Sequence, residues 1–177
     1  MVRAAAVLRR GGVIANATEA VIGLAARAHD RAAGQRIRVL KRRPQAKGFI
    51  VVAASVEQLQ GLVEFDTPLW VEVLASWPGP HTWVLPASAG APPWLLSKTR
   101  DIAVRVTAHP QMAALCRAVG ALVSTSANPA GRRPARSLLA ARRYFRRRVD
   151  LYLAGEIGAA GRPTTIRDGR SGHLVRA

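Results

Sequence analysis

The sequence has little cysteine and few acidic residues, and both shortages restrict the class of protein. Cys116 is the single cysteine, which excludes an internal disulfide and is typical of proteins from the reducing cytoplasm. Ten acidic residues stand against 27 lysines and arginines, so a mechanism with paired carboxylates is disfavoured. No apolar run approaches the roughly 18 residues of a membrane span. We therefore expect a cytoplasmic protein without a membrane partner.

Several common catalytic signatures are also missing. No G-x-S-x-G elbow supports a Ser-His-Asp triad, although the sequence alone leaves such a triad open. Neither the G-x-x-x-x-G-K-[ST] loop nor G-x-G-x-x-G occurs, so any nucleotide must be bound by another device. The histidines are far apart and form no ligand pair with Cys116, so no metal site is expected. His109, which precedes Pro110, is expected to be structural.

What the sequence does have is positive charge and enough apolar residues for a core. The formal net charge is +17, almost all of it from arginine, and so large a field attracts nucleotides, RNA or acidic surfaces. An arginine-rich genome would also scatter such residues over the surface, so charge alone names no reaction. With 177 residues and 49% hydrophobic content, we expect a single domain, 1–177, with a buried core.

Periodicity predicts strands that alternate with helices. Helices are expected at about 2–10, 31–42, 56–63, 110–120 and 137–148, and strands at 11–16, 48–55, 77–87, 102–110, 121–128, 150–153 and 173–176. Residues 16–26 read as an irregular strand or turn because Gly23 interrupts an apolar segment. Several connections are short, which favours an α+β fold with a mixed sheet over a doubly wound one.

Three clusters could carry chemistry. Lys41, Arg43 and Lys47 flank a proline before a strand, where they either offset the dipole of a helix end or clamp a triphosphate. Arg105 alternates with apolar residues on a strand and points either to solvent or into a cleft.

The third cluster is the segment "LVSTSANPAG" (122–131), in which a buried strand ends in small polar residues. It is either an ordinary turn or a site where hydroxyls and backbone N–H groups let a ligand approach the end of a strand.

Six segments, which cover about residues 11–176, follow one another in a recognisable order. They are "GGVIANATEAVIGL", "LKRRPQAKGFIVVAAS", "WPGPHTWVLPA", "IAVRVTAHP", "LVSTSANPAGRRPAR" and "GRPTTIRDGRSGHLVR". Taken in order, these segments resemble the YrdC/TsaC family of threonylcarbamoyl-AMP synthases. The family's K-x-R…S-x-N signature falls on Lys41, Arg43, Ser126 and Asn128. The chain resembles the short bacterial form without the extra C-terminal domain.

The resemblance implies a twisted mixed sheet flanked by helices, with a basic concave cleft. It implies that L-threonine, bicarbonate and ATP give threonylcarbamoyl-AMP and pyrophosphate, with Mg²⁺ carried on ATP. The product would feed the modification of adenosine beside the anticodon of tRNA, through partner proteins that transfer the threonylcarbamoyl group. Such chemistry requires positioned reactants and charge stabilisation rather than an attacking side chain.

The resemblance also implies a role for each matching residue. For catalysis the matches are Lys41, Arg43, Ser126 and Asn128. For threonine they are Thr18, Arg105, Thr125 and Thr164. For ATP they are Arg43, Lys47, Ser126, Asn128 and Arg176. Thr82 and Asp168 are further candidates.

One segment departs from the family pattern. Asn16 and Ala17 stand where the family usually has Tyr-Pro, so a stacking wall and a rigid turn are expected to be missing. The basic run 142–148 is either a solvated helix face or a surface for tRNA or partner proteins.

Two other functions remain open. One is a non-catalytic RNA-binding protein on the same fold. The other is a carbamoyl-adenylating relative that does not use threonine.

Overall fold

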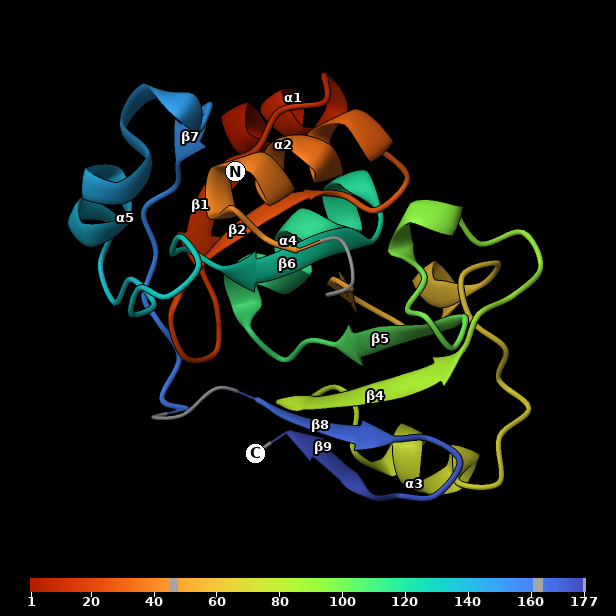
Figure 1. Ribbon diagram of the computed structural model, residues 1–177. Helices are drawn as coiled ribbons and strands as arrows, with labels where there is room; N and C mark the ends of the chain where they lie inside the picture. Colours follow the sequence, from red (N-terminus) through yellow and green to blue (C-terminus); the bar gives the residue numbers. More distant parts are fainter. Residues whose placement is uncertain (45–47, 161–163, 177) are drawn as a thin grey trace.

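Nine strands form one mixed sheet in the computed structural model, which describes residues 1–44, 48–160 and 164–176. Their order across the sheet is β7-β1-β2-β6-β3-β5-β4-β8-β9 (Figure 1). The strands are β1 (Ile14–Ala17), β2 (Ile22–Arg27), β3 (Ile50–Ala53), β4 (His81–Pro86), β5 (Asp101–Val106), β6 (Leu122–Ser126), β7 (Leu151–Tyr152), β8 (Thr165–Asp168) and β9 (Leu174–Arg176).

The helices lie mostly where the periodicity predicts them. The expected helix at 137–148 divides into α5 and a 3-10 turn at Arg146–Arg148. His109 caps α4 by accepting a hydrogen bond from the Met112 N–H at 3.4 Å, which confirms its structural role. The helices are α1 (Val2–Arg9), α2 (Arg31–Lys41), α3 (Trp70–Ala75), α4 (Pro110–Val119) and α5 (Leu138–Phe145).

Both parallel and antiparallel pairs hold the sheet together. β6 is the fourth of the nine strands across the sheet and runs antiparallel to both of its neighbours, β2 and β3. The pairs β3–β5, β1–β7 and β4–β8 are parallel. This pairing confirms the predicted α+β class with a mixed sheet.

Four local predictions were wrong or incomplete. The segment 16–26 forms a regular hairpin in which β1 and β2 pair antiparallel around the turn 18–21. The helix expected at 56–63 shrinks to a 3-10 turn at Glu57–Leu59, followed by Gly61 at a φ of 74° that interrupts any helix. α3 and β8 were not predicted, because each is too short to show a clear period.

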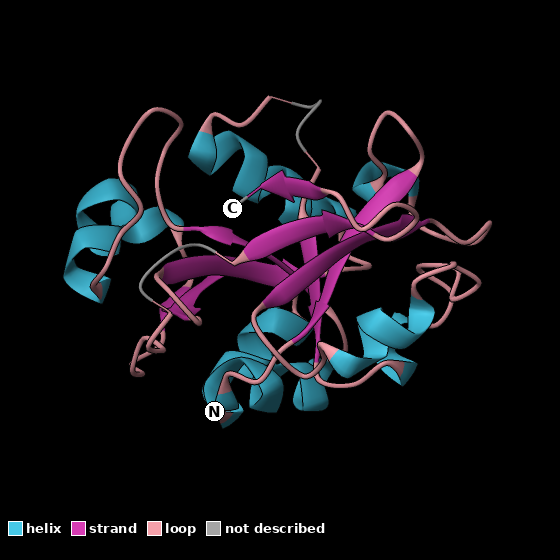
Figure 2. Ribbon diagram, turned by 90° about the horizontal axis from the view of Figure 1, so that it is seen from below, coloured by secondary structure: helices cyan, strands magenta, loops and turns pink. Residues whose placement is uncertain are grey.

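Helices cover both faces of the sheet (Figure 2). α1 and α4 share one apolar cluster, in which Leu8 and Leu115 pack with Leu122 of β6 and Val52 of β3. α2, α3 and α5 contribute to the other cluster, for example through Ile37, Val73 and Phe145. Within the described residues, no helix has the length and apolar character needed to span a membrane.

Candidate functional site

The face of the sheet under α1 and α4 carries large side chains at one end and a cavity at the other. Leu122 and Val52 are paired across β6 and β3 and are fully buried in the cluster with α4. We call this pair the covered row. Ser124 lies two residues after Leu122 on β6, so its side chain points to the same face of the sheet, because side chains alternate along a strand. Ser124 is not part of that cluster, although its strand partner Ile50 is half-buried and packs against the edge of the cluster.

The next row forms the floor of a cavity of about 440 Å³. It crosses four strands, since Ser124 pairs with Ile50, Ile50 with Ala103 and Ala103 with Val84. We call these four residues the floor row, and all of them line the cavity. Each is smaller than an aromatic residue, and Ser124 and Ala103 are among the smallest side chains, which leaves space above the sheet.

Gly23 keeps the same space open beside β6. It pairs with Ser126, and a Cβ at this position would lie 2.9 Å from the Thr18 methyl carbon and 3.4 Å from the Ser124 Oγ. Any larger residue would therefore push against the turn that carries Thr18. The small residues at the end of β6 and Gly23 of β2 together account for the lack of bulk in "LVSTSANPAG".

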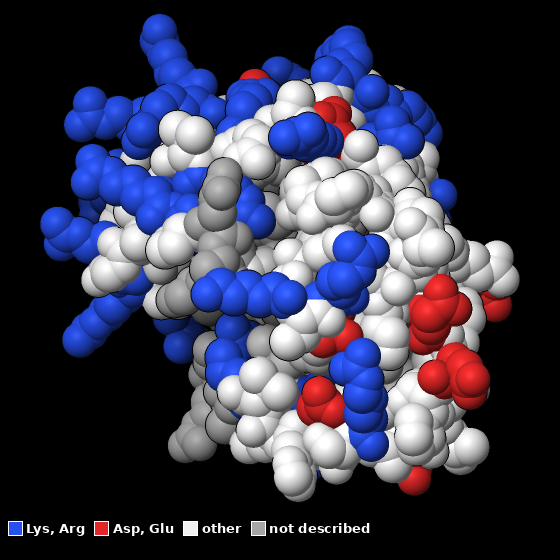
Figure 3. Space-filling view, turned by 45° about the vertical axis from the view of Figure 1, so that its right-hand side comes forward, with Lys and Arg blue, Asp and Glu red and all other residues white. Residues whose placement is uncertain are grey.

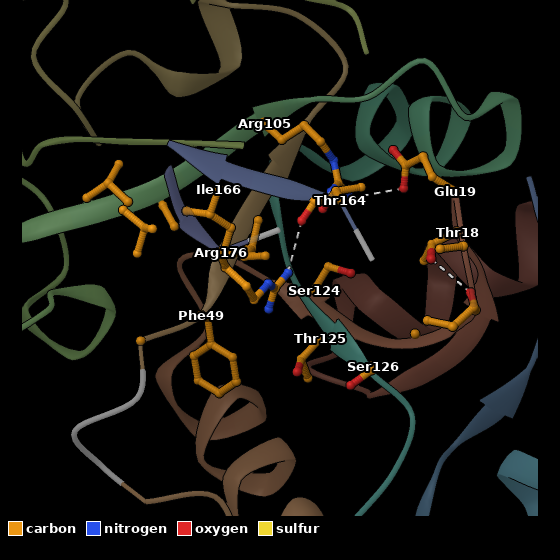
Figure 4. Close-up of a pocket in the computed structure, with 18 of the residues that line it drawn as sticks. Thr18, Glu19, Phe49, Arg105, Ser124, Thr125, Ser126, Thr164, Ile166 and Arg176 are labelled. Carbon is orange, nitrogen blue, oxygen red and sulfur yellow. Dashed lines mark hydrogen bonds and ion pairs between the residues drawn. The ribbon is translucent and has the colours of Figure 1, made fainter. Parts of the chain in front are cut away.

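Three of the predicted basic residues line this cavity: Arg43, Arg105 and Arg176. In Figure 4, Arg105 and Arg176 approach from the side of β5, β8 and β9, and Ser124, Thr125 and Ser126 lie along β6. The Arg43 Nη2 donates to the Gly48 carbonyl at 2.6 Å, and its guanidinium lies 5.6 Å from the centre of the Phe49 ring. Burial, and then the neighbouring charges of Arg38 and Arg176, lower the pKa of Arg43.

Arg105 is the most enclosed of the three cations, and its side chain is held by several partners. Its Nη2 forms an ion pair with the Glu19 Oε2 at 3.0 Å, and its Nη1 donates to the Thr164 Oγ1 at 2.7 Å. Burial lowers the pKa of Arg105, and the charge of Glu19 opposes that shift. The sequence left open whether Arg105 points to solvent or into a cleft. Arg105 points into the cleft, because it is only 4% exposed and lines the cavity.

Most of the predicted site residues lie together. The cavity is lined by Thr18, Arg43, Arg105, Thr125, Ser126, Thr164 and Arg176. Lys41, Asn128, Thr82 and Asp168 are not among the residues that line it. Lys47 lies outside the described residues.

Lys41 lies beneath the cavity wall and braces the loop that follows β6. Its Nζ donates to the Ser126 carbonyl, to the Asn128 carbonyl at 2.8 Å and to the Asn128 Oδ1 at 3.4 Å. The Asn128 Oδ1 also accepts from the Ser126 hydroxyl at 2.6 Å. Burial, followed by the charge of Arg43, lowers the pKa of Lys41 to about 8. Two of the four residues of the K-x-R…S-x-N signature, Lys41 and Asn128, therefore support the cavity wall from behind. The other two, Ser126 and Arg43, line the cavity itself.

The two further candidates also have contacts outside the cavity. Thr82 is fully buried, and its Oγ1 lies 3.5 Å from the Arg105 Nη1. The Asp168 Oδ1 accepts from the backbone N–H groups of Arg170 and Ser171, both at 2.9 Å. Burial raises the pKa of Asp168, but these hydrogen bonds outweigh it and the net shift is downward. Asp168 thus stabilises the turn between β8 and β9.

Asn16 pairs across the hairpin with Gly23, which lines the cavity, but the Asn16 side chain itself is held under α4. Its side chain is fully buried, and its Nδ2 donates to the Ala17 carbonyl at 2.8 Å and to the Met112 Sδ of α4 at 3.4 Å. It is not among the residues that line the cavity. Where the family pattern has an aromatic side chain, this chain therefore has a polar contact under α4.

Sequence reasoning missed several residues of the cavity. Glu19 and Asp101 bring carboxylates to its lining, and Phe49 and Ile166 bring apolar surface. The Asp101 Oδ1 pairs with the Arg170 Nη2 at 2.8 Å. The cavity is basic as expected, but two of its charges are carboxylates that already have arginine partners. Nothing in the sequence separates these acids from the others, because burial depends on the assembled sheet.

The described residues offer little for covalent or metal chemistry. Burial raises the pKa of the Cys116 thiol to about 12, so it is not a thiolate nucleophile at neutral pH. Among the described residues, no three His, Cys, Asp or Glu side chains are grouped as metal ligands. The cavity instead presents guanidinium groups and hydroxyls, which bind and align anionic or polar reactants.

Charge of the two signs is separated over the surface. Figure 3 shows Lys and Arg gathered at the upper left of that view, with Asp and Glu mainly at the lower right. Between positions 132 and 148 the chain carries eight arginines, all exposed. Arg142 lies over the Tyr152 ring, 4.7 Å from its centre.

The family model described as telomere recombination, Sua5/YciO/YrdC, matches residues 6–177. The chain belongs to this family. It is similar to a threonylcarbamoyl-AMP synthase from Halorhodospira halophila, with 53% identity over 98% of this chain and 92% of the relative. A protein of the same name from Xanthomonas euvesicatoria is 51% identical over 98% of this chain and 95% of its own length.

A solved structure of Sua5 from P. abyssi, complexed with L-threonine, has the same fold. Its TM-score is 0.86 at 33% identity, and the match covers 94% of this chain. This chain spans 49% of that protein. The family match and the solved fold confirm the resemblance that the sequence segments indicated.

Proposed function

We propose that the chain makes threonylcarbamoyl-AMP and pyrophosphate from L-threonine, bicarbonate and ATP. The observation that carries this proposal is the convergence of Arg43, Arg105 and Arg176 on one cavity bordered by the end of β6. Relatives that share about half of the residues over nearly the whole chain carry the name of this synthase. The activity makes the chain a nucleotidyltransferase of tRNA modification.

The chemistry needs alignment rather than a protein nucleophile. The amine of threonine forms a carbamate either by attacking CO2, with its proton passing to water, or by attacking bicarbonate, with a C–O bond broken and water released. A carbamate oxygen then attacks the α-phosphorus of ATP, and pyrophosphate leaves with the electron pair of the broken P–O bond. Hydroxyls and guanidinium groups that hold these reactants in line and balance the developing charge are sufficient.

We assign the residues to two ends of the cavity. Arg105, with Thr18, Thr125 and Thr164, binds threonine and pairs with its carboxylate. Arg43 and Arg176, with Ser126, bind the phosphates and nucleotide. This division is supported by the pairing of Arg105 with Glu19, which leaves the amino-acid end less cationic than the phosphate end.

The remaining candidates act around these groups. Lys41 and Asn128 act by holding the loop after β6 in shape. Lys47, outside the described residues, stays a proposed phosphate ligand. Thr82 and Asp168 are proposed to support the wall formed by β4, β8 and β9.

The proposed partners follow from the reaction. Mg²⁺ enters with ATP, bound to its phosphate oxygens, and is part of the substrate. The reaction takes place in the cytoplasm, and threonylcarbamoyl-transfer proteins receive the product. The eight exposed arginines at 132–148 support the proposal that this surface of the protein also contacts tRNA.

The test is pyrophosphate release from ATP, measured with threonine and bicarbonate omitted in turn. We expect release only when both are present. Turnover without threonine would favour the carbamoyl-adenylating relative. Salt-sensitive RNA binding without turnover would favour the non-catalytic RNA-binding protein.

A matched pair of variants locates the phosphate end. Arg43→Ala is expected to lower kcat/KM for ATP by about 100-fold, the usual loss when one charge-stabilising donor is removed. Arg42→Ala removes the same charge from the adjacent, exposed position and is expected to change kcat/KM less than about threefold. Equal effects of the two substitutions would contradict the role of Arg43.

A further inference from the structure

Glu19 is a buried carboxylate at the edge of the cavity, and the proposed reaction leaves it without a role. It is 8% exposed and lies in the turn between β1 and β2. Its Oε2 pairs with the Arg105 Nη2 at 3.0 Å, and its Oε1 accepts from the Thr107 hydroxyl at 2.5 Å. Both carboxylate oxygens are thus engaged on residues of β5 or just beyond it, as Figure 4 shows for Arg105.

The backbone of Glu19 is anchored as well. Its carbonyl accepts from the Ala160 N–H at 3.1 Å, and the Gly158 N–H donates to the carbonyl of the preceding residue, Thr18, at 2.9 Å. The carboxylate is therefore held from both its side chain and its main chain. A group fixed in this way can impose an orientation on its partner.

Arg105 needs such a partner more than the other two cations do. It is 4% exposed, and a buried guanidinium without a counter-charge is strongly unfavourable. Glu19 and Thr164 occupy Nη2 and Nη1, while the Arg105 Nε is buried and has no acceptor among the described residues. A buried donor without an acceptor costs free energy, so a ligand that supplies an oxygen would relieve it.

We propose that Glu19 is a positioning residue, which fixes the guanidinium of Arg105 so that its remaining N–H groups meet the carboxylate of the amino-acid substrate. This proposal rests on the proposed function, because it takes Arg105 as the group that binds that carboxylate. Glu19 itself does not contact the substrate.

Calorimetric titration with L-threonine tests the proposal on the full chain without requiring turnover. Glu19→Gln keeps the size of the side chain and an oxygen for Thr107, but removes the charge that orients Arg105. We expect the Kd for L-threonine to rise about tenfold, as for other coupled pairs, with KM for ATP nearly unchanged. Glu64→Gln removes an exposed carboxylate outside the cavity and is expected to leave both constants unchanged.

A double-mutant cycle separates positioning from direct contact. Arg105→Lys loses the planar fork, so Glu19→Gln added to it is expected to weaken threonine binding less than about twofold further. Effects that multiply in the double variant would show that Glu19 acts on threonine directly and would overturn the proposal. So would unchanged threonine binding in folded Glu19→Gln, with folding checked by the thermal unfolding midpoint.

Failure of the positioning role of Glu19 and failure of the synthase function give different experimental results. If the wild-type chain binds threonine but releases no pyrophosphate, the synthase function fails while the cycle still decides the role of Glu19. If the wild-type chain does not bind threonine, this inference is overturned as well.

Discussion

The covered row and the floor row lie side by side on one face of the sheet, yet one is packed under helices and the other lines a cavity. In the covered row, Leu122 and Val52 are fully buried in the cluster formed with α1 and α4. In the floor row, Ser124 and Ala103 leave space for a cavity. A shift of two residues along β6 thus separates a stabilising contact from a binding surface.

The comparison shows how one face serves stability and function at once. Burying a leucine side chain contributes about 1.5–3 kcal/mol, so the covered row supports the sheet that carries the site. The floor row gives up such burial, and the free volume admits reactants. We can therefore alter one row while leaving the other intact.

The largest effect is expected when the floor row is made like the covered row. Ser124→Leu places a branched apolar side chain in the cavity, and we expect kcat/KM for pyrophosphate release to fall by 100-fold or more. The free energy of unfolding, measured by urea titration, should fall by no more than about 1 kcal/mol, because the cavity accepts the added volume. Retained activity in this variant would mean that the reaction occurs elsewhere.

The reverse change makes the covered row smaller. Leu122→Ala leaves a void under α4, and the free energy of unfolding is expected to decrease by about 2–5 kcal/mol. At a temperature where the variant stays folded, kcat/KM should remain within about threefold of the wild-type value. A loss of activity as large as that in Ser124→Leu would show that the two rows are not separable.

A smaller effect concerns the loop that Lys41 braces beside the floor row. The pKa of Lys41 is about 8 in the folded chain, below its ordinary value of 10.5. Between these pH values the unfolded state binds more protons, so this group makes the free energy of unfolding rise with pH. Compared with Lys41→Met, the wild-type chain should gain stability between about pH 7.5 and 9.5 in urea titrations. Parallel curves would contradict this.

The smallest effect is expected for Ser124→Ala, which keeps the floor row small. We expect kcat/KM to change less than about threefold and the free energy of unfolding to change by less than about 1 kcal/mol. A loss approaching that of Ser124→Leu would mean that the hydroxyl of Ser124, rather than its size, is what the reaction needs. The pair therefore separates volume from hydrogen bonding.

The sequence predicted those parts of the site that depend on local pattern. Alternation along 102–106 placed Arg105 on the side of the strand away from Ile102 and Val104, and the structure confirms that this side faces the cavity. The small residues of "STSAN" indicated that a ligand could approach the backbone at the end of β6, with an ordinary turn as the alternative. The family signature joined Arg43 to Ser126, residues that lie almost half the chain apart, which spacing alone could not do.

Other features depend on assembly and were not readable from the sequence. Whether Lys41 faces a ligand or the underside of a loop depends on where β6 ends relative to α2, and in the folded chain its Nζ donates to the Asn128 carbonyl. Glu19 resembles any other acid until β5 is placed beside the turn that carries it. β8 has only four residues, and its pairing with β4 becomes apparent only in the folded sheet.

A crystal structure of the chain with L-threonine and a non-hydrolysable ATP analogue would show directly whether the floor row carries the reactants. We expect both ligands in the cavity above the floor row. The threonine carboxylate should lie about 3 Å from the Arg105 guanidinium, and the phosphates should lie beside Arg43 and Arg176. Threonine or phosphates bound outside this cavity, with the floor row facing only solvent, would contradict this expectation.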